Sequence, residues 1–352
     1  MKTSFFKQVN QMEDQDNLID AINISKQMLT NRDLIGLHNI IKSNINRIIR
    51  KLEARVSNYW KDPEIIYQIS KNPYSYCSDT SNIANDDLPP IISLTTISSR
   101  LDRVKHTIKS IQNQTLKIHS INLYISESPY LLDKGIDKNC NELIELHKMG
   151  VNIYSVPNIG PYRKQIPIIY QLKNSAASPY TPIITIDDDV IYPNDIVNKL
   201  INIKDWVVVA HRGREMILDN TKIGDYNKFS LAKTKRSYLH LGTGKNGILY
   251  RLGFFPNNKE AYVGPLIAPT ADDLWCKWIT AFSCIPTEIL EPEAAFNAKL
   301  DFQESDPTDK NGLFHQFNKK GSNDIAIKNL ENYYFCKFNQ NLFTIFSFTE
   351  RS

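Results

Sequence analysis

Short apolar runs alternate with segments of helical periodicity through the middle of the chain. Runs rich in β-branched residues predict buried strands at 91–97, 121–126, 151–157 and 183–186. Apolar residues spaced three and four apart predict helices between them, over 104–116, 140–149 and 163–173. Such alternation favours right-handed β-α-β units and a mostly parallel sheet flanked by helices. The strand ends at Thr95 and Asp187 are then expected at one rim of the sheet.

A different pattern precedes this one. After a capping box at Thr30–Asp33, apolar positions recur every three or four residues from Leu34 to Trp60 and predict one long amphipathic helix. Its other faces are basic, with Lys42, Arg47, Arg50, Lys51 and Arg55. Two interpretations stay open. The helix packs on a neighbour or on a second subunit of a homo-oligomer, or its basic face makes peripheral contact with an anionic membrane.

These patterns divide the chain into three parts, which we expect to be an N-terminal helical region at 1–87, an α/β domain at 88–292 and a C-terminal region at 293–352. The polar stretch 75–90 predicts a linker between the first two. In the last part, the polar segment 301–324 predicts a lid, and the aromatic stretch Tyr333–Phe348 is expected to pack on the α/β domain.

Composition narrows the function classes. A formal net charge of +4 across 352 residues is too mild to indicate nucleic acid, and it suits an anionic substrate or a membrane surface. The five cysteines include no C-x-x-C pair, so they favour neither a disulfide framework nor a zinc site. Neither a signal peptide nor a membrane span is evident in the sequence. We therefore expect a cytoplasmic protein, either free or held at the inner face of the membrane.

Three consecutive aspartates, Asp187, Asp188 and Asp189, end the apolar run 183–186. Adjacent carboxylates repel one another, so a fold keeps them together most easily where a cation or solvent neutralises them. Carboxylate oxygens suit Mg²⁺ or Mn²⁺, which leave coordination positions for substrate phosphates. The alternative is an acidic turn before a helix whose first turn contains Asp195.

Other charged pairs occur at the starts of predicted helices. Arg163 and Lys164 suit contacts with a diphosphate, or they form a solvated first turn. Asp272 and Asp273 open an amphipathic helix, where aspartate is also common as a cap. A strand over 206–210 runs into a polar loop with His211, Arg212 and Arg214.

The segment 242–247, GTGKNG, matches G-x-G-x-x-G, but the pattern after it predicts a strand rather than the helix that a dinucleotide site needs. Its glycines instead suit a mobile loop or a simple hairpin turn.

In their order, the segments IISLTTISSR, NIGPYRKQ, PIITIDDDVIYP and APTADDLWCKW resemble a bacterial nucleotide-sugar-dependent glycosyltransferase of the GT-A type, close to family two. The resemblance covers Pro90 to Trp278. It implies a Rossmann-like α/β sandwich that binds the nucleotide on its first half and the acceptor on its second.

The resemblance also assigns roles to residues. It implies that the loop after the first strand holds the nucleotide, that the aspartate triplet and the 163–164 pair meet the nucleotide sugar, and that the 272–273 pair is catalytic. The nucleotide-sugar set is Thr95, Thr96, Ser98, Arg100, Arg163, Lys164, Asp187 and Asp188. The metal set, for Mn²⁺ or Mg²⁺, is Asp189, Asp187 and His315.

Within these sets the triplet can be registered in two ways. We expect Asp189 on the metal and Asp187 toward the ribose. In inverting members of the resembled family, the second acid of the pair is the general base, so Asp273 takes that role and Asp272 supports it. His315, as a lone histidine, is either a third metal ligand or structural.

The expected function is transfer of a sugar from a nucleotide diphosphate to a glycan or glycolipid acceptor, with inversion, in bacterial surface polysaccharide synthesis. A sugar nucleotidyltransferase is one alternative, although TTISSR lacks the glycine-rich loop typical of that class. A non-catalytic glycan-binding or scaffold subunit with the same fold is another.

Overall fold

A computed structural model describes residues 2–14, 17–56, 62–68, 88–219, 222–258, 262–291, 303–306, 308 and 312–349. Most of the predicted linker, at 75–87, lies outside these residues. The central sheet is built from β1 Glu64–Tyr67, β2 Ile91–Thr95, β3 Ser120–Ile125, β4 Val151–Ser155, β5 Pro182–Thr185, β7 Val208–Ala210, β12 Arg236–Ser237, β14 Ile248–Arg251 and β15 Thr287–Ile289.

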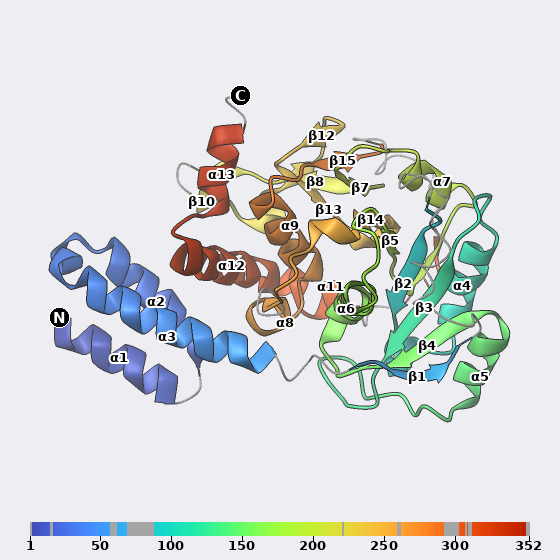
Figure 1. The fold of residues 1–352 in the computed structure, drawn as a ribbon, viewed down its shortest axis with the longest axis horizontal. Coiled ribbons are helices and arrows are strands. Elements are labelled where there is room, and N and C mark those ends of the chain that lie inside the picture. Colours follow the sequence, from blue (N-terminus) through green and yellow to red (C-terminus); the bar gives the residue numbers. More distant parts are fainter. Residues whose placement is uncertain are drawn as a thin grey trace.

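These nine strands form one mixed sheet in the order β1-β4-β3-β2-β5-β14-β7-β15-β12 (Figure 1). The neighbours β4, β3, β2 and β5 are parallel, which confirms an α/β fold with a mostly parallel centre. The strand predicted after the glycine-rich segment is β14, which lies antiparallel between β5 and β7. One edge strand, β1, comes from the part of the chain that the sequence predicts to be helical.

Helices cover both faces of this sheet because its strands are apolar on both faces. In β2, Ile91 belongs to the core on one face, whereas Ile92 and Leu94 belong to the core on the other. The second core is completed by α4 Val104–Gln112, α5 Asn141–Lys148 and α7 Ile196–Ile201. The first core contains α6 Ile166–Asn174, α8 Gly264–Ile267 and α9 Asp272–Phe282.

The N-terminal region contains three helices, α1 Lys2–Asp14, α2 Leu18–Thr30 and α3 His38–Val56. The sequence predicts one helix from Leu34, but residues 32–37 form a separate 3₁₀ turn. The predicted capping box is also absent, because the Thr30 hydroxyl donates back to the Lys26 and Gln27 carbonyls and Asn31 caps the turn instead. The apolar face of α3 is buried as its periodicity predicts.

The two ends of the chain pack together. Helix α12, Ser322–Phe338, contacts α2, α3 and α9, and α13, Leu342–Thr349, contacts α9. Polar contacts join these helices: the Asn332 side-chain amide donates to Asn23 at 2.6 Å, and the Tyr333 hydroxyl donates to Glu53 at 2.7 Å. The apolar faces of the N-terminal helices are therefore covered by the chain's own C-terminal helix.

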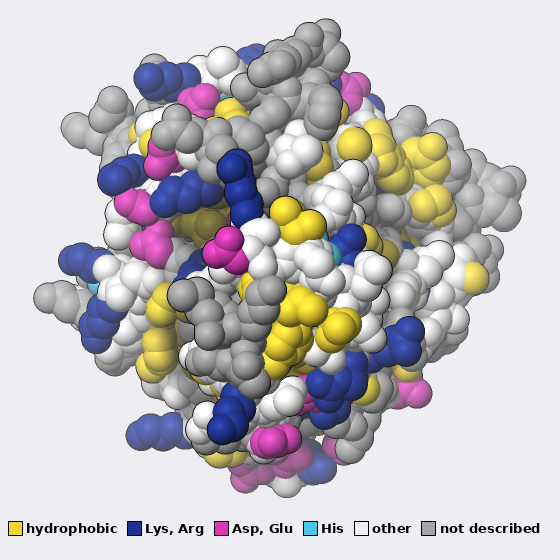
Figure 2. Space-filling model, turned by 90° about the vertical axis from the view of Figure 1, so that its left-hand side faces the viewer, with side chains coloured by type: hydrophobic (Ala, Val, Ile, Leu, Met, Phe, Trp, Pro, Cys, Tyr) yellow, Lys and Arg dark blue, Asp and Glu magenta, His cyan; other side chains and the backbone are white. Residues whose placement is uncertain are grey.

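Part of the basic face of α3 is neutralised within the molecule, because Arg47 and Lys51 both pair with Glu13 of α1. On the face drawn in Figure 2, Lys and Arg side chains are dispersed among acidic and apolar ones. In the described part of the chain, no helix combines the length and the apolar character needed to cross a bilayer.

Smaller sheets arrange the loops at the rim. Strands β8 Gly213–Glu215, β11 Ser230–Leu231 and β13 His240–Gly242 form one of them. Two strand pairs make the others, β9 Leu218–Asp219 with β10 Lys222–Ile223, and β6 Val190–Ile191 with β16 Gln303–Glu304. The last pair, together with α11 Leu313–Gln316, brings the C-terminal region to the end of β5.

Candidate active site

The carboxyl ends of β2 and β5 open into a cavity of about 450 Å³, within the range of nucleotide and cofactor sites. Its lining includes residues from every segment that the sequence singles out: Thr95, Thr96, Arg100, Arg163, Lys164, Asp187, Asp188, Asp189, Asp272, Asp273 and His315. The parallel arrangement of β2 and β5 explains this convergence, as expected from the strand pattern.

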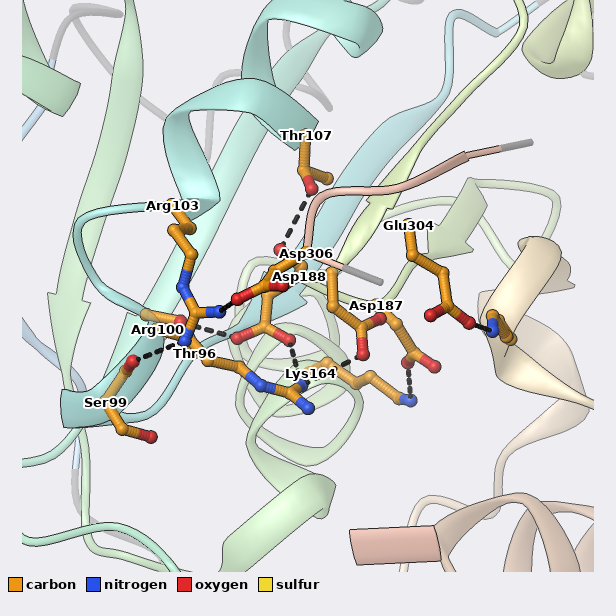
Figure 3. Close-up of polar contacts among 12 residues, drawn as sticks. Thr96, Ser99, Arg100, Arg103, Thr107, Lys164, Asp187, Asp188, Glu304 and Asp306 are labelled. Atoms are coloured by element: carbon orange, nitrogen blue, oxygen red, sulfur yellow. Dashed lines mark hydrogen bonds and ion pairs between the residues drawn. The ribbon is translucent and has the colours of Figure 1, made fainter. Parts of the chain in front are cut away.

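The middle aspartate of the triplet is committed to the protein. Asp188 is 6 % exposed, and its two carboxylate oxygens accept hydrogen bonds from the Thr96 hydroxyl at 2.5 Å and Arg100 at 2.9 Å (Figure 3). The Thr107 hydroxyl donates to the backbone carbonyl of Asp188 at 2.9 Å. Asp188 therefore fixes the loop that follows β2, where the nucleotide is expected.

Asp187 faces the opposite way, toward α9 rather than toward that loop. One of its oxygens lies 2.7 Å from the Lys164 ammonium, which also lies 3.1 Å from Asp272. Burial alone lowers the pKa of Lys164, but the charges of Asp187, Asp272 and Asp273 outweigh it and raise the pKa well above its ordinary value. Lys164 thus joins the two acidic motifs, and Asp188 replaces Asp187 as the contact to the nucleotide-side loop.

Asp189 has weaker compensation. Its carboxylate lies 3.1 Å from Arg100, a cation that it shares with Asp188. Burial and the charges of Asp188 and Asp187 raise the pKa of Asp189 to about 7. A carboxylate whose negative charge is disfavoured by burial and by neighbouring carboxylates is a suitable ligand for an added cation.

The donor set fits Mg²⁺ or Mn²⁺, which take one or two protein carboxylates and complete their shell with water and phosphate oxygens. Asp187 and Asp189 provide these two carboxylates at the cavity wall. Within the described residues, however, no three His, Cys, Asp or Glu side chains converge as a metal site. His315 lines the cavity and is exposed, and its role as a third ligand stays a prediction.

The acidic pair at the start of α9 does not cap the helix, because Ala271 occupies the cap position and its side chain makes no hydrogen bond there. Asp272 is 7 % exposed and accepts a hydrogen bond from the Gln165 side chain at 2.7 Å. Asp273 accepts one from the Gly244 backbone N–H at 2.8 Å through Oδ2. The pair therefore contributes to the site rather than to the helix end.

The second oxygen of Asp273 is the distinctive atom of the site. Oδ1 is buried and has no hydrogen-bond partner among the described residues. Burial and the negative charge of Asp272 raise the pKa of Asp273 to about 7, against the attraction of Lys164. A carboxylate with a pKa near neutral and one unused oxygen in a cavity has the properties of a general base.

Gly244 explains the glycine-rich segment 242–247. The segment links β13 to β14, which belong to different sheets, so it is not a simple hairpin. A Cβ atom at Gly244 would lie 3.1 Å from Asp273 Oδ1, 3.0 Å from the Lys164 ammonium and 3.4 Å from Asp187 Oδ1. The absent side chain leaves room for these three charged groups to converge.

Two residues of the predicted nucleotide set have structural partners instead. Arg163 is 1 % exposed, pairs with Asp133 at 2.8 Å and donates to the Thr96 carbonyl at 3.0 Å. The Ser98 hydroxyl accepts from the Lys134 backbone N–H at 3.0 Å and does not line the cavity. Both brace the loop after β2 against residues 133–134, which the sequence motifs do not reveal.

Further lining residues lie outside the site sets predicted from the sequence: Tyr130, Asp133, Arg212, Arg214, Tyr226, Lys245, Glu304 and Asp306. Glu304 pairs with Lys245, and Asp306 pairs with Arg103, so the segment around β16 is held across the end of the triplet (Figure 3). The Ser305 N–H donates to the Asp189 carbonyl at 2.9 Å. The sequence pointed to some of these residues through the polar loop with Arg212 and Arg214, the glycine-rich segment with Lys245 and the predicted lid at 301–324.

No family model and no curated protein matches this chain.

Proposed function

We propose that this protein is a metal-dependent glycosyltransferase of the GT-A type, which moves a sugar from a nucleotide diphosphate to an acceptor hydroxyl with inversion. One observation carries the proposal. Lys164 joins the acidic triplet after β5 to the acidic pair of α9, and leaves Asp189 and Asp273 in the same cavity with pKa values of about 7. Asp189 is then suited to bind a cation, and Asp273 is suited to accept a proton.

The donor fits the half of the cavity formed by the loop after β2. Thr95, Thr96 and Arg100 line it, and Asp188 holds Arg100 and Thr96 in place. A Mn²⁺ or Mg²⁺ ion held by Asp189 and Asp187 would neutralise the diphosphate and stabilise it as a leaving group. The resemblance to family-two enzymes supports the same placement of the nucleotide.

Transfer requires a base on the other side of the sugar. In the proposed step, the acceptor oxygen bonds to the anomeric carbon as the bond from that carbon to the phosphate oxygen breaks, and Asp273 Oδ1 takes the hydroxyl proton. The Gly244 N–H keeps the carboxylate oriented through Oδ2. A direct displacement of this kind inverts the anomeric configuration.

An acceptor of bacterial surface polysaccharide, either a glycan or a glycolipid, remains the expectation from the resemblance. A non-catalytic scaffold is less well supported, because a buried carboxylate with one oxygen lacking a described partner costs stability without serving such a role. A nucleotidyltransferase would release pyrophosphate rather than a nucleoside diphosphate.

Nucleotide release tests the proposal. Purified protein with Mn²⁺ is incubated with a panel of nucleotide sugars, with and without a mixed pool of glycan acceptors, and nucleoside diphosphate is measured. We expect release with at least one donor, loss of metal-dependent nucleotide binding in Asp189→Ala, and retained binding with lost transfer in Asp273→Asn. A parallel incubation replaces the nucleotide sugars with nucleoside triphosphates and sugar 1-phosphates, and release of pyrophosphate there would favour the nucleotidyltransferase. The absence of nucleotide release with every donor would favour the scaffold.

A further inference from the structure

Two arginines form a wall of the cavity that the proposed reaction leaves without a role. Arg212 and Arg214 both line the cavity, Arg214 lies in β8 and Arg212 directly precedes that strand. Residues two apart in extended backbone project to the same side. The strand therefore presents both guanidinium groups to the cavity together.

Arg214 differs from four other cations of the cavity, each of which pairs with a carboxylate of the site: Arg100, Arg163, Lys164 and Lys245. Arg214 forms no ion pair with any described carboxylate; it donates to the Phe229 carbonyl at 2.8 Å and lies 5.5 Å from the centre of the Tyr226 ring. Burial and the positive charge of Arg214 lower the pKa of Arg212. Two like charges are thus held close together.

This wall adjoins the general base rather than the nucleotide loop. The Thr243 N–H donates to the Arg212 carbonyl at 3.1 Å, and the next residue, Gly244, donates to Asp273. Tyr226 also lines the cavity; burial and the charge of Asp273 raise its pKa, and the charges of Arg214 and Arg212 lower it. Its backbone N–H donates to Asp324 of α12 at 2.7 Å, which fixes the Tyr226 loop.

We infer that Arg212, Arg214 and Tyr226 form a subsite for an anionic group, a carboxylate or a phosphate, on the acceptor that gives its proton to Asp273. Guanidinium groups bind such oxyanions with paired charge-assisted hydrogen bonds. The inference rests on the proposed function for its direction, because it names the acceptor class as an acidic saccharide or a phosphorylated glycan. The donor phosphates are expected at the other end of the cavity, near Asp189 and Arg100.

Binding of small glycosides tests the subsite without requiring turnover. Saturation-transfer NMR on the full chain with Mn²⁺ and a nucleoside diphosphate compares four probes: methyl glucoside, methyl glucuronide, methyl glucoside 6-phosphate and the methyl glycoside of N-acetylneuraminic acid. We expect at least one anionic glycoside to bind about tenfold or more tightly than methyl glucoside, as charge-assisted hydrogen bonds predict. The preferred probe separates a carboxylate acceptor from a phosphorylated one.

Variants then locate the binding. Arg214→Met is expected to remove the preference for the anionic probe, and Arg214→Lys to keep part of it because a charge remains without the planar fork. Lys228→Met is the matched control, since it removes an exposed cation near Tyr226 that pairs with Asp225 and does not line the cavity. Equal binding of neutral and anionic probes, or an anionic preference that survives in Arg214→Met, would overturn the inference.

The two proposals fail separately. The protein could bind an anionic glycoside through Arg214 and yet release no nucleotide from any donor. That result would support the anion subsite and refute the glycosyltransferase proposal. Nucleotide release with neutral acceptors alone would support the glycosyltransferase and refute the anion subsite. If Arg214→Met instead weakened nucleoside diphosphate binding, the arginines would serve the donor, and the acceptor assignment would be wrong.

Discussion

Replacing Asp273 by asparagine separates the energetic cost of this carboxylate from its chemical use. The amide has nearly the same shape, and its oxygen can still accept the hydrogen bond that the Gly244 N–H donates at 2.8 Å. The substitution removes a negative charge that burial and Asp272 oppose. We therefore expect a protein that is more stable than the wild type at alkaline pH and inactive in transfer.

The magnitude follows from the pKa. The pKa of Asp273 rises from 3.8 to about 7, and each pKa unit corresponds to about 1.4 kcal/mol. A raised pKa in the folded state means that the protonated group favours folding and that this contribution is lost as pH rises through 7. The full difference approaches about 4 kcal/mol above pH 8. The new amide N–H lies where Oδ1 has no described partner, which costs about 1–3 kcal/mol.

The expected net gain in the free energy of unfolding is therefore about 1–3 kcal/mol at pH 8, and near pH 4, where the charge no longer opposes folding, it gives way to a loss from the unpaired amide. Urea denaturation of the wild type and of Asp273→Asn at pH 4.5, 6 and 8 measures this difference in the free energy of unfolding. In the variant, nucleotide release in the presence of acceptor should fall by about 10²–10⁴-fold.

Asp205→Asn is the matched control. Asp205 precedes β7, and its exposed carboxylate pairs with Arg236 away from the cavity lining, so the free energy of unfolding should not rise and nucleotide release should not fall. A loss of stability in Asp273→Asn at pH 8, or full turnover in that variant, would refute the reasoning.

Three further perturbations test other parts of the site. The kcat/KM of the wild-type protein should rise with pH and level off above about 7, because Asp273 must lose its proton to act as the base. A pH-independent profile would contradict the assignment of Asp273 as the base. Lys164→Met should lower the free energy of unfolding by about 3–5 kcal/mol, because it leaves the buried Asp272 and the partly buried Asp187 without their cation. Lys199→Met at an exposed pair should change it by less than about 1 kcal/mol in the same denaturation experiment. Gly244→Ala should reduce turnover while circular dichroism shows a folded protein, because the added Cβ would lie 3.1 Å from Asp273 Oδ1. Unchanged turnover would show that the reaction does not need Asp273, Lys164 and Asp187 to converge at Gly244.

The sequence was most informative where local pattern decides structure. Apolar runs predicted β2, β3, β4 and β5, and the parallel sheet then required the residues after β2 and β5 to meet at one rim. The start of α9 at Asp272 was predicted from the change to helical periodicity. These features follow from hydrogen bonding and burial within or between neighbouring segments.

Side-chain direction was harder to predict, because it depends on contacts between distant residues. The triplet's sequence does not reveal that Asp188 turns inward to Thr96 and Arg100 while Asp187 turns to Lys164. Arg163 looked like a phosphate ligand because it is a cation at a helix start. Its partner Asp133 lies thirty residues earlier in a loop without a motif.

The charges at the centre of the cavity explain why an added cation is part of the proposal. Among the described residues, the ion pairs of the five carboxylates in the two acidic motifs are made with Lys164 and Arg100, and two of the five, Asp189 and Asp273, have pKa values raised to about 7. A nucleotide diphosphate would add more negative charge to this region, so its binding requires a cation that the protein's own side chains do not provide. On the arginine wall, Arg212 and Arg214 instead hold two positive charges close together. In the proposed reaction the cavity therefore separates a region that suits a cation from one that suits an anion, and Asp273 lies near both, where the acceptor hydroxyl and the donor sugar would meet.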